Sequence, residues 1–300
     1  SESGLEIEVW DAARLETEPC GSRLEVARGY GGIAPEVPHA LHMPSHIFTR
    51  LGLWQESAEW NARSAAAVLD QHDGETIVDH YPHAIDYAVY AHLQAGDTEA
   101  AEALLGELAA HPDLQDSFGS AYATSAAPAR VPLESGDWAA AAALPAEMNP
   151  ALTWARYPQA VAMRWFAKGI GAARSGDLDG ARTATEELTA LRAVMVERGM
   201  GYWVTLSDAQ IGSIGAWLAL AEGDEAGARD LMTLAAEAED AVGKAPVTPG
   251  HVLPARELLG DLLLEIGDAQ AAAAAYEAAL AESPNRARSL TGLEEASRDD

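Results

Sequence analysis

Segments with the apolar spacing of an α-helix alternate with alanine-rich segments along most of the chain. Apolar residues three or four positions apart share one face of a helix, and alanine loses the least entropy on entering one. Runs of β-branched residues, which would favour strands, are few. The pattern therefore predicts an all-α protein.

A Gly-Asp dipeptide punctuates this pattern at regular intervals. It occurs at Gly96-Asp97, Gly136-Asp137, Gly176-Asp177, Gly223-Asp224 and Gly267-Asp268, with Gly52-Leu53-Trp54 as a variant. Successive glycines lie 44, 40, 40, 47 and 44 residues apart. Glycine suits the left-handed end of one helix, and aspartate can cap the start of the next. We therefore expect six helical hairpins.

The last predicted hairpin carries small and large residues in a recognisable order. These residues are Leu259, Gly260, Leu263, Gly267, Ala272, Tyr276, Ala279 and Pro284. The order resembles the tetratricopeptide repeat (TPR), a helical hairpin of about 34 residues. A weaker resemblance runs through Trp165, Gly169, Gly176 and Ala181, and the other hairpins match by the phase of their turns. The longer spacing here is accommodated by proline-rich connectors at 72–82, 144–158 and 243–254.

The resemblance implies a right-handed α-solenoid over residues 38–298, whose first helices line a concave groove. We divide it into histidine-rich units at 38–110, central units at 117–240, and a C-terminal unit with a polar capping helix at 251–298, near Arg286 to Arg298. We expect residues 1–37 to form a separate helical segment that is a truncated or divergent repeat. Pro128 and Pro132 are expected to interrupt the first helix of the third unit.

Charge and composition narrow the classes of function. The chain has 19 basic and 47 acidic residues, a net charge of −28 and a pI near 4.5, which argues against nucleic acid as a partner. No apolar run reaches the roughly 20 residues that span a bilayer. The single cysteine, Cys20, excludes an internal disulfide and a thiolate metal site. The sequence opens at Ser1 without a basic-then-apolar leader pattern, so we expect a cytoplasmic protein and leave processed export open.

Seven of the nine histidines lie between His39 and His92. Two triplets share the spacing i, i+3, i+7: His39, His42 and His46 in the first unit, and His83, Asp86 and Tyr90 in the second. Both triplets occupy the same positions of their repeats, positions that in the TPR family face the groove. Core positions in the same helices hold Leu41, Phe48, Ile85, Ala88 and Val89.

These triplets predict a metal site, because neighbouring helices lie about 10 Å apart and imidazoles from both can reach one ion. The preferred ligands are His42, His46, His83 and Asp86, with His39 and His80 in reserve. A histidine-rich set with one carboxylate suits Zn, Cu, Fe or Ni rather than Ca or Mg. Tyr90 and His80 are the candidate catalytic residues. Pro44 can move the start of the helix to Met43 and leave His39 and His42 on the preceding turn.

The stretch HALHMPSHIF also resembles a histidine-rich subgroup of bacterial TPR proteins. Our first hypothesis is a metal-dependent enzyme acting on a small organic substrate. The alternative is a non-catalytic TPR scaffold that binds a protein or peptide partner in its groove. A third reading places a small ligand among the central tryptophans Trp154, Trp165, Trp203 and Trp217. Of the other histidines, His92 is expected to pack in the core, and His72, His111 and His251 to be solvated.

Overall fold

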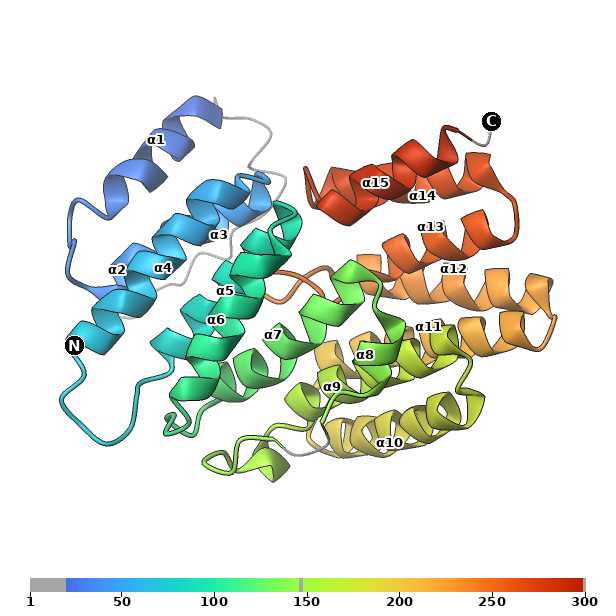
Figure 1. The fold of residues 1–300 in the computed structure, drawn as a ribbon, viewed down its shortest axis with the longest axis horizontal. Coiled ribbons are helices and arrows are strands. Elements are labelled where there is room, and N and C mark those ends of the chain that lie inside the picture. Colours follow the sequence, from blue (N-terminus) through green and yellow to red (C-terminus); the bar gives the residue numbers. More distant parts are fainter. Residues whose placement is uncertain (1–19, 146–147, 299–300) are drawn as a thin grey trace, which may run out of the picture.

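The computed structural model describes residues 20–145 and 148–298 and is all-helical there, apart from an isolated bridge between Ile77 and Leu114 (Figure 1). The α-helices are α1 (Cys20–Tyr30), α2 (Pro38–His42), α3 (Pro44–Arg50), α4 (Trp54–Asp70), α5 (His80–Gln94), α6 (Thr98–Ala110), α7 (Phe118–Ser135), α8 (Trp138–Ala142), α9 (Pro158–Ser175), α10 (Leu178–Glu197), α11 (Gly201–Ala221), α12 (Glu225–Val242), α13 (Ala255–Glu265), α14 (Ala269–Glu282) and α15 (Ala287–Ala296), with a 3₁₀ turn at Trp154–Arg156. The all-α prediction is confirmed. Within the described residues, every helix is too short or too polar to cross a bilayer. Residues 1–19 of the predicted N-terminal segment lie outside the described residues.

The predicted turns have the expected chemistry. The glycine at each of the six predicted turns has positive φ. These glycines are Gly52, Gly96, Gly136, Gly176, Gly223 and Gly267. The five aspartates that follow accept a backbone N–H three residues further on, at 2.9–3.2 Å. Each turn joins two helices that pack against each other, such as α9 with α10 and α13 with α14. Local turn chemistry thus sets the alternation of helices along the chain.

The expected interruption at Pro128 and Pro132 is wrong, because α7 runs unbroken from Phe118 to Ser135 with both prolines inside it. Pro128 cannot donate to the carbonyl of Thr124, four residues back. Arg164 of α9 donates to that carbonyl instead, at 3.1 Å. The short helix of this pair is the second one, α8, which ends after five residues.

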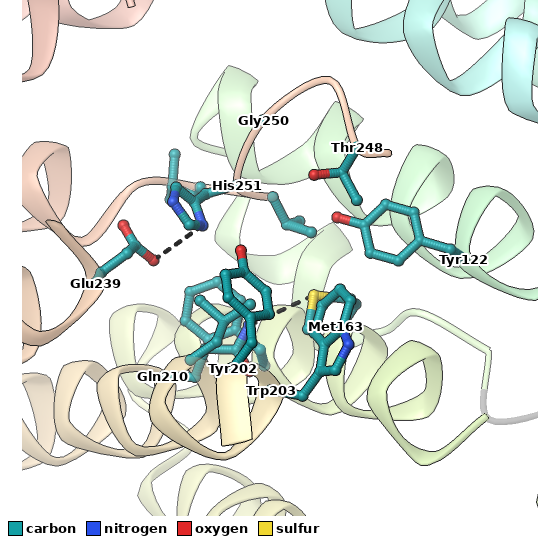
Figure 2. Close-up of a pocket in the computed structure, with 13 residues that line it drawn as sticks. Tyr122, Met163, Tyr202, Trp203, Gln210, Glu239, Thr248, Gly250 and His251 are labelled. Carbon is teal, nitrogen blue, oxygen red and sulfur yellow. Dashed lines mark hydrogen bonds and ion pairs between the residues drawn. The ribbon is translucent and has the colours of Figure 1, made fainter. Parts of the chain in front are cut away.

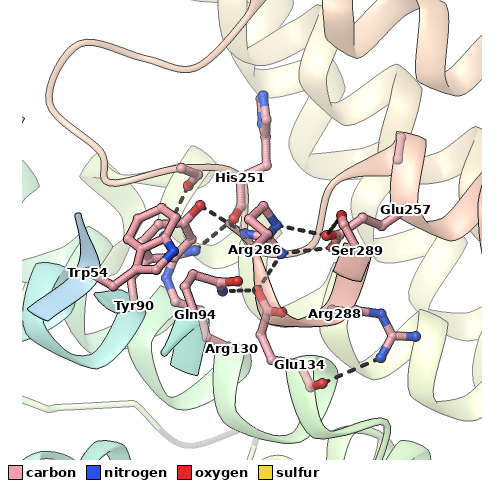
Figure 3. A network of polar contacts seen from close by, with 12 residues as sticks. Trp54, Tyr90, Gln94, Arg130, Glu134, His251, Glu257, Arg286, Arg288 and Ser289 are labelled. Atoms are coloured by element: carbon pink, nitrogen blue, oxygen red, sulfur yellow. Dashed lines mark hydrogen bonds and ion pairs between the residues drawn. The ribbon is translucent and has the colours of Figure 1, made fainter. Parts of the chain in front are cut away.

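The end of the chain returns to its beginning, as Figures 1 and 3 show. The Trp54 indole donates to the Asn285 carbonyl at 2.7 Å. Next to it, Arg286 donates to the Tyr90 hydroxyl at 2.8 Å and to the carboxylate of Glu257 at 2.7 Å. Arg286, expected beside a polar capping helix, is instead fully buried. The contact therefore ties α15 to α4 and α5.

The connector between α12 and α13, residues 243–254, also folds back against α5 and α7. Arg130 of α7 donates to the carbonyl of His251 at 2.7 Å and to that of Gly250 at 3.1 Å. A Cβ on Gly250 would lie 2.7 Å from the Tyr90 hydroxyl, so the backbone approaches that ring closely. The face of α5 predicted to line an open groove is therefore covered, and both Asp86 and Tyr90 are buried.

The predicted core positions of the first two units are confirmed. Leu41, Phe48, Ile85, Ala88 and Val89 are all buried. They hold α2, α3, α4 and α5 together, and this packing positions the histidines described next.

Candidate metal centre

Three histidines from three helices converge on one point: His42 at the end of α2, His46 in α3 and His83 in α5. The Nε2 atom of His42 lies 3.0 Å from Nε2 of His46 and 3.0 Å from Nε2 of His83. One ligand atom from each of the three lies within 4.8 Å of the others. His42 is buried, and the other two rings are half-buried.

The proline at position 44 shapes this arrangement without destroying it. Pro44 is the first residue of α3, where its missing N–H costs nothing. Met43 between the two helices keeps helical angles, with φ −52° and ψ −39°. The chain therefore passes from α2 into α3 with little change of direction, and His42 and His46 share a face four residues apart.

Asn61 of α4 fixes which nitrogen of His42 carries the proton. Its amide nitrogen donates to the Ser57 carbonyl at 2.7 Å, so its oxygen faces Nδ1 of His42, also at 2.7 Å. An amide oxygen only accepts, which requires Nδ1 of His42 to carry the hydrogen. The Nε2 lone pair of His42 therefore points at the other two histidines.

With this tautomer of His42, the three Nε2 atoms cannot all be satisfied by hydrogen bonds to one another. The single lone pair of His42 faces two Nε2 atoms, each of which offers either an N–H or a lone pair. Two N–H groups would share one acceptor, whereas two lone pairs at 3.0 Å would repel each other. A cation at the centre removes the conflict, because all three lone pairs can then bind it.

Tyr87 supports His46 from the other side. Its hydroxyl lies 3.0 Å from Nδ1 of His46. The hydroxyl can rotate, so it donates when Nδ1 of His46 is bare and accepts when Nδ1 carries the proton. The second state frees Nε2 of His46 for a metal ion, which is the usual role of such a partner.

The electrostatics of the cluster favour neutral imidazoles. Burial, followed by the charges of neighbouring histidines, lowers the pKa of His42, His46 and His83 to about 3. Neutral imidazole is the form that binds metal ions. Over the neutral and mildly acidic range the ligands therefore need not lose a proton first.

Asp86, the fourth predicted ligand, lies outside the cluster. One oxygen of its carboxylate accepts from Nε of Arg130 at 3.0 Å, and the other has no hydrogen-bond partner among the described residues. Burial raises the pKa of Asp86, while Arg130 opposes that shift. The carboxylate therefore faces Arg130 on α7 and lies outside the group of histidines from α2, α3 and α5.

Tyr90, a predicted catalytic residue, also faces away from the histidines. Its ring packs edge-on against Trp54 and between the guanidinium groups of Arg130 and Arg286, and its hydroxyl accepts from Arg286. The tyrosine at the cluster is Tyr87, which lies four residues after His83.

His39 and His80, the reserve ligands, lie beside the cluster as a pair with ring centroids 5.1 Å apart. The ring of His39 is 6.5 Å from that of His42, and His39 is exposed. Both lie outside the group that can share one ion.

Sequence reasoning missed Asn61 and Tyr87, although both leave a signal. Asn61 belongs to a buried polar stripe on α4 with Ser57 and Ser64, at spacings of four and three residues. Polar residues at helical spacing on an otherwise apolar face indicate a polar partner opposite. Tyr87 has the i, i+4 relation to His83 that places both on one face.

The remaining histidines divide differently from our expectation. His92 is half-buried, with Nδ1 3.5 Å from the Asp97 carboxylate. His251 was predicted to be solvated, but its side chain is only 16% exposed and lies 3.5 Å from the carboxylate of Glu239. It lines a small cavity with Tyr202 and Trp203 (Figure 2). Of the four central tryptophans, Trp203 alone lines that cavity.

Comparison with known proteins gives no further identification. No family model matches the chain, and no curated protein matches it at a significant level.

Proposed function

We propose that this protein is a TPR-like metalloprotein in which His42, His46 and His83 bind one transition-metal ion. The observation that carries the proposal is the convergence of three Nε2 atoms with the lone pair of His42 directed inward. Nitrogen ligands that bind at 2.0–2.1 Å in a tetrahedral site lie about 3.3 Å apart. The observed 3.0 Å contacts need only a small outward shift to reach that spacing.

Three protein ligands leave a coordination position for an exchangeable molecule. Catalytic zinc sites have this arrangement, whereas structural zinc sites use four protein ligands. A redox-inactive ion there would polarise water or a substrate oxygen, and iron or copper would also bind dioxygen. We therefore propose a metal-dependent enzyme for a small organic substrate, whose reaction class depends on the ion.

The TPR assignment remains part of the proposal. It is supported by the six turns at 40–47-residue spacing and by close helix contacts at small residues. A Cβ on Gly260 would lie 2.6 Å from the Tyr276 ring, so this pair of helices packs as closely as the repeat requires. The right-handed superhelix is an expectation of the same resemblance.

The scaffold alternative has less support at this end of the molecule. A peptide in the groove would have to occupy the face of α5 that carries Tyr90. That face is covered by Gly250 of the connector and by Arg286. The histidine cluster, in contrast, is assembled from side chains already in place.

Elemental analysis of protein purified without an affinity tag or metal column tests the proposal directly. We expect about one equivalent of a transition metal per chain after reconstitution, and loss of that metal in His42→Ala and His83→Ala. The metal should also raise the melting temperature of the wild-type protein, because an ion that binds only the folded state stabilises it.

His92→Ala is the matched control, because His92 lies on the same helix as His83 but outside the cluster. It should retain the full metal content. Absence of metal from the reconstituted wild-type protein, or equal metal content in all variants, would contradict the proposal.

A further inference from the structure

Two further histidines lie one helical turn before two ligands of the proposed metal site. His39 precedes His42 by three residues on α2, and His80 precedes His83 by three residues on α5. Residues three apart lie on the same face of a helix, one turn along its axis. The rings of His39 and His80, the outer pair, also meet across the two helices, with centroids 5.1 Å apart. Histidines from α2 and α5 therefore face each other at two successive levels.

The outer pair repeats the geometry of the inner pair, His42 and His83. The rings of the inner pair have centroids 4.5 Å apart, and their Nε2 atoms are 3.0 Å apart. Two imidazoles that bind one ion have ring centroids about 4.5–5.2 Å apart when the angle at the ion is roughly 90–110°. The 5.1 Å separation of the outer pair falls in this range. The outer pair thus has the spacing of two ligands on a common ion.

The hydrogen bonds that order the cluster do not involve the outer pair. They join His42 to Asn61 and to the other two ligands, and among the described residues none extends to His39 or His80. The ring of His39 is exposed, and that of His80 is half-buried. Their nitrogens are therefore available to an ion, and water can complete its coordination. Because the outer pair lies outside the group that can share one ion, such an ion is a separate one.

Tyr87 covers the side of the cluster that is remote from the outer pair. Its ring is buried and packs against all three ligand rings, at centroid distances of 4.8–5.1 Å. Along α5, Tyr87 follows His83 by four residues, whereas His80 precedes it by three. Tyr87 and His80 therefore lie on opposite sides of His83 along the helix axis. The exchangeable coordination position is expected on the side of the outer pair, away from the tyrosine ring.

We infer that His39 and His80 bind a second divalent transition-metal ion beside the ion held by the cluster, so that the centre takes two ions. The inference rests on the proposed metal site and extends it to a dinuclear one. Three residues of a helix advance by about 4.5 Å along its axis, so the two ions lie roughly 5 Å apart. A substrate group with two oxygens, a carboxylate or a phosphate, can bridge ions at this spacing, as substrates do in two-metal sites.

The second ion should bind more weakly than the first. The outer pair offers two protein ligands where the cluster offers three, and two divalent ions at this distance repel each other. The net charge of −28 reduces this penalty, because an acidic protein attracts cations. Dialysis should therefore leave one ion on the protein, and the second should bind only with free metal in solution.

Titration with Zn²⁺ followed by calorimetry counts the ions. We expect two binding steps for the wild-type protein. His39→Ala and His80→Ala should each weaken the second step about tenfold or more and leave the first within about twofold of the wild type. His72→Ala is the matched control, because His72 is a half-buried histidine outside the cluster and the outer pair. It should keep both steps.

Electron paramagnetic resonance of the protein with two equivalents of Cu²⁺ tests whether the ions are neighbours. Two Cu²⁺ ions roughly 5 Å apart couple magnetically, so their spectrum is broadened or quenched relative to the sum of two isolated ions. We expect this coupling in the wild-type protein and in His72→Ala. It should be absent from His39→Ala and His80→Ala.

A wild-type protein that binds no metal overturns the proposed function together with this inference. A single binding step in the wild type overturns the inference alone, as does a second step that His39→Ala and His80→Ala leave unchanged. A Cu²⁺ spectrum equal to the sum of two isolated ions also overturns it. Two coupled ions that are reduced to one in both variants and kept in His72→Ala support it.

Discussion

At the residue scale, the decisive feature is the way one amide determines a tautomer. Asn61 is held by the Ser57 carbonyl, and its oxygen can only accept from His42. The lone pair directed at the cluster therefore depends on a side chain that is not itself a ligand. Ser45, whose hydroxyl lies 3.5 Å from Nδ1 of His42, is a more distant neighbour.

Asn61→Leu should keep the shape of the side chain but release the tautomer of His42. We expect metal affinity to fall about 10- to 100-fold, as is usual when the partner of a ligating histidine is lost. Competition with a chelator of known affinity would measure it. Ser64→Ala, which removes a hydroxyl bonded to the Pro38 carbonyl on the same face of α4, should change affinity far less.

Burial of Glu239 makes the stability of the folded protein depend on pH. It is buried, and burial raises its pKa to about 8, against the opposing effect of the Ala255 N–H that it accepts. The folded-state pKa of Glu239 lies above the ordinary value of 4.5, so folding favours the protonated carboxyl. Its contribution to the free energy of unfolding is therefore complete below about pH 4.5 and is lost as the pH rises toward 8.

Glu239→Gln mimics the protonated carboxyl and should remove this dependence. Relative to the variant, the wild-type protein should lose free energy of unfolding between pH 5 and pH 8, by up to about 1.4 kcal/mol per pH unit. Urea denaturation at several pH values would measure the gap. Parallel profiles for the two proteins would show that Glu239 is ionised throughout.

Helical spacing predicts which residues share a face of a helix, and this is how much of the site the sequence reveals. Spacing places His42 and His46 on one face, and the repeat register brings His83 opposite. Spacing alone does not tell whether a polar position faces the cluster or the next helix. Asp86 turns to α7 because Arg130 is there, 44 residues further along the chain.

At the element scale, the helices follow from local signals and the connectors do not. Glycine and aspartate mark the turns because their chemistry is local. The survival of α7 through Pro128 depends instead on Arg164 of another helix, which supplies the missing donor. The packing of residues 243–254 against α5 likewise depends on Arg130, which donates hydrogen bonds to two of their carbonyls.

Gly250→Ala tests the packing of that connector. The added Cβ would lie 2.7 Å from the Tyr90 hydroxyl, and overpacking of this kind costs about 1–3 kcal/mol. Gly106→Ala, in the interior of α6 with open space around its Cβ, should instead stabilise the protein by up to about 1 kcal/mol. Chemical denaturation should show a lower free energy of unfolding for Gly250→Ala and a higher one for Gly106→Ala.

At the scale of the whole molecule, Arg286 is the principal tie between the two ends of the chain. Its guanidinium is buried and pairs with Glu257 and Glu134, both at 2.7 Å, while also donating to Tyr90 (Figure 3). The pKa of Arg286 is raised well above its usual value by the two carboxylates against the effect of burial. The network joins α5, α7, α13 and α15.

Arg286→Leu should lower the free energy of unfolding by about 3–5 kcal/mol, because it leaves two buried carboxylates unpaired. The loss should be smaller in acid, where burial already raises the pKa of Glu134 and protonation removes its charge. Thermal and urea unfolding at pH 5 and pH 8 would measure both effects. Arg182→Leu, which breaks only exposed pairs, should leave stability unchanged within error.

The hydrogen bond between Trp54 and Asn285 joins residues 231 positions apart, so it can form only after nearly the whole chain has been synthesised. During synthesis the histidine helices emerge long before the connector and the last turn exist. At 5–20 residues per second, residue 243 follows residue 90 by roughly 8–30 seconds. For that interval the connector and Arg286 are missing from the Tyr90 face of α5, so Tyr90 is exposed to solvent in the nascent chain although it is buried in the finished molecule.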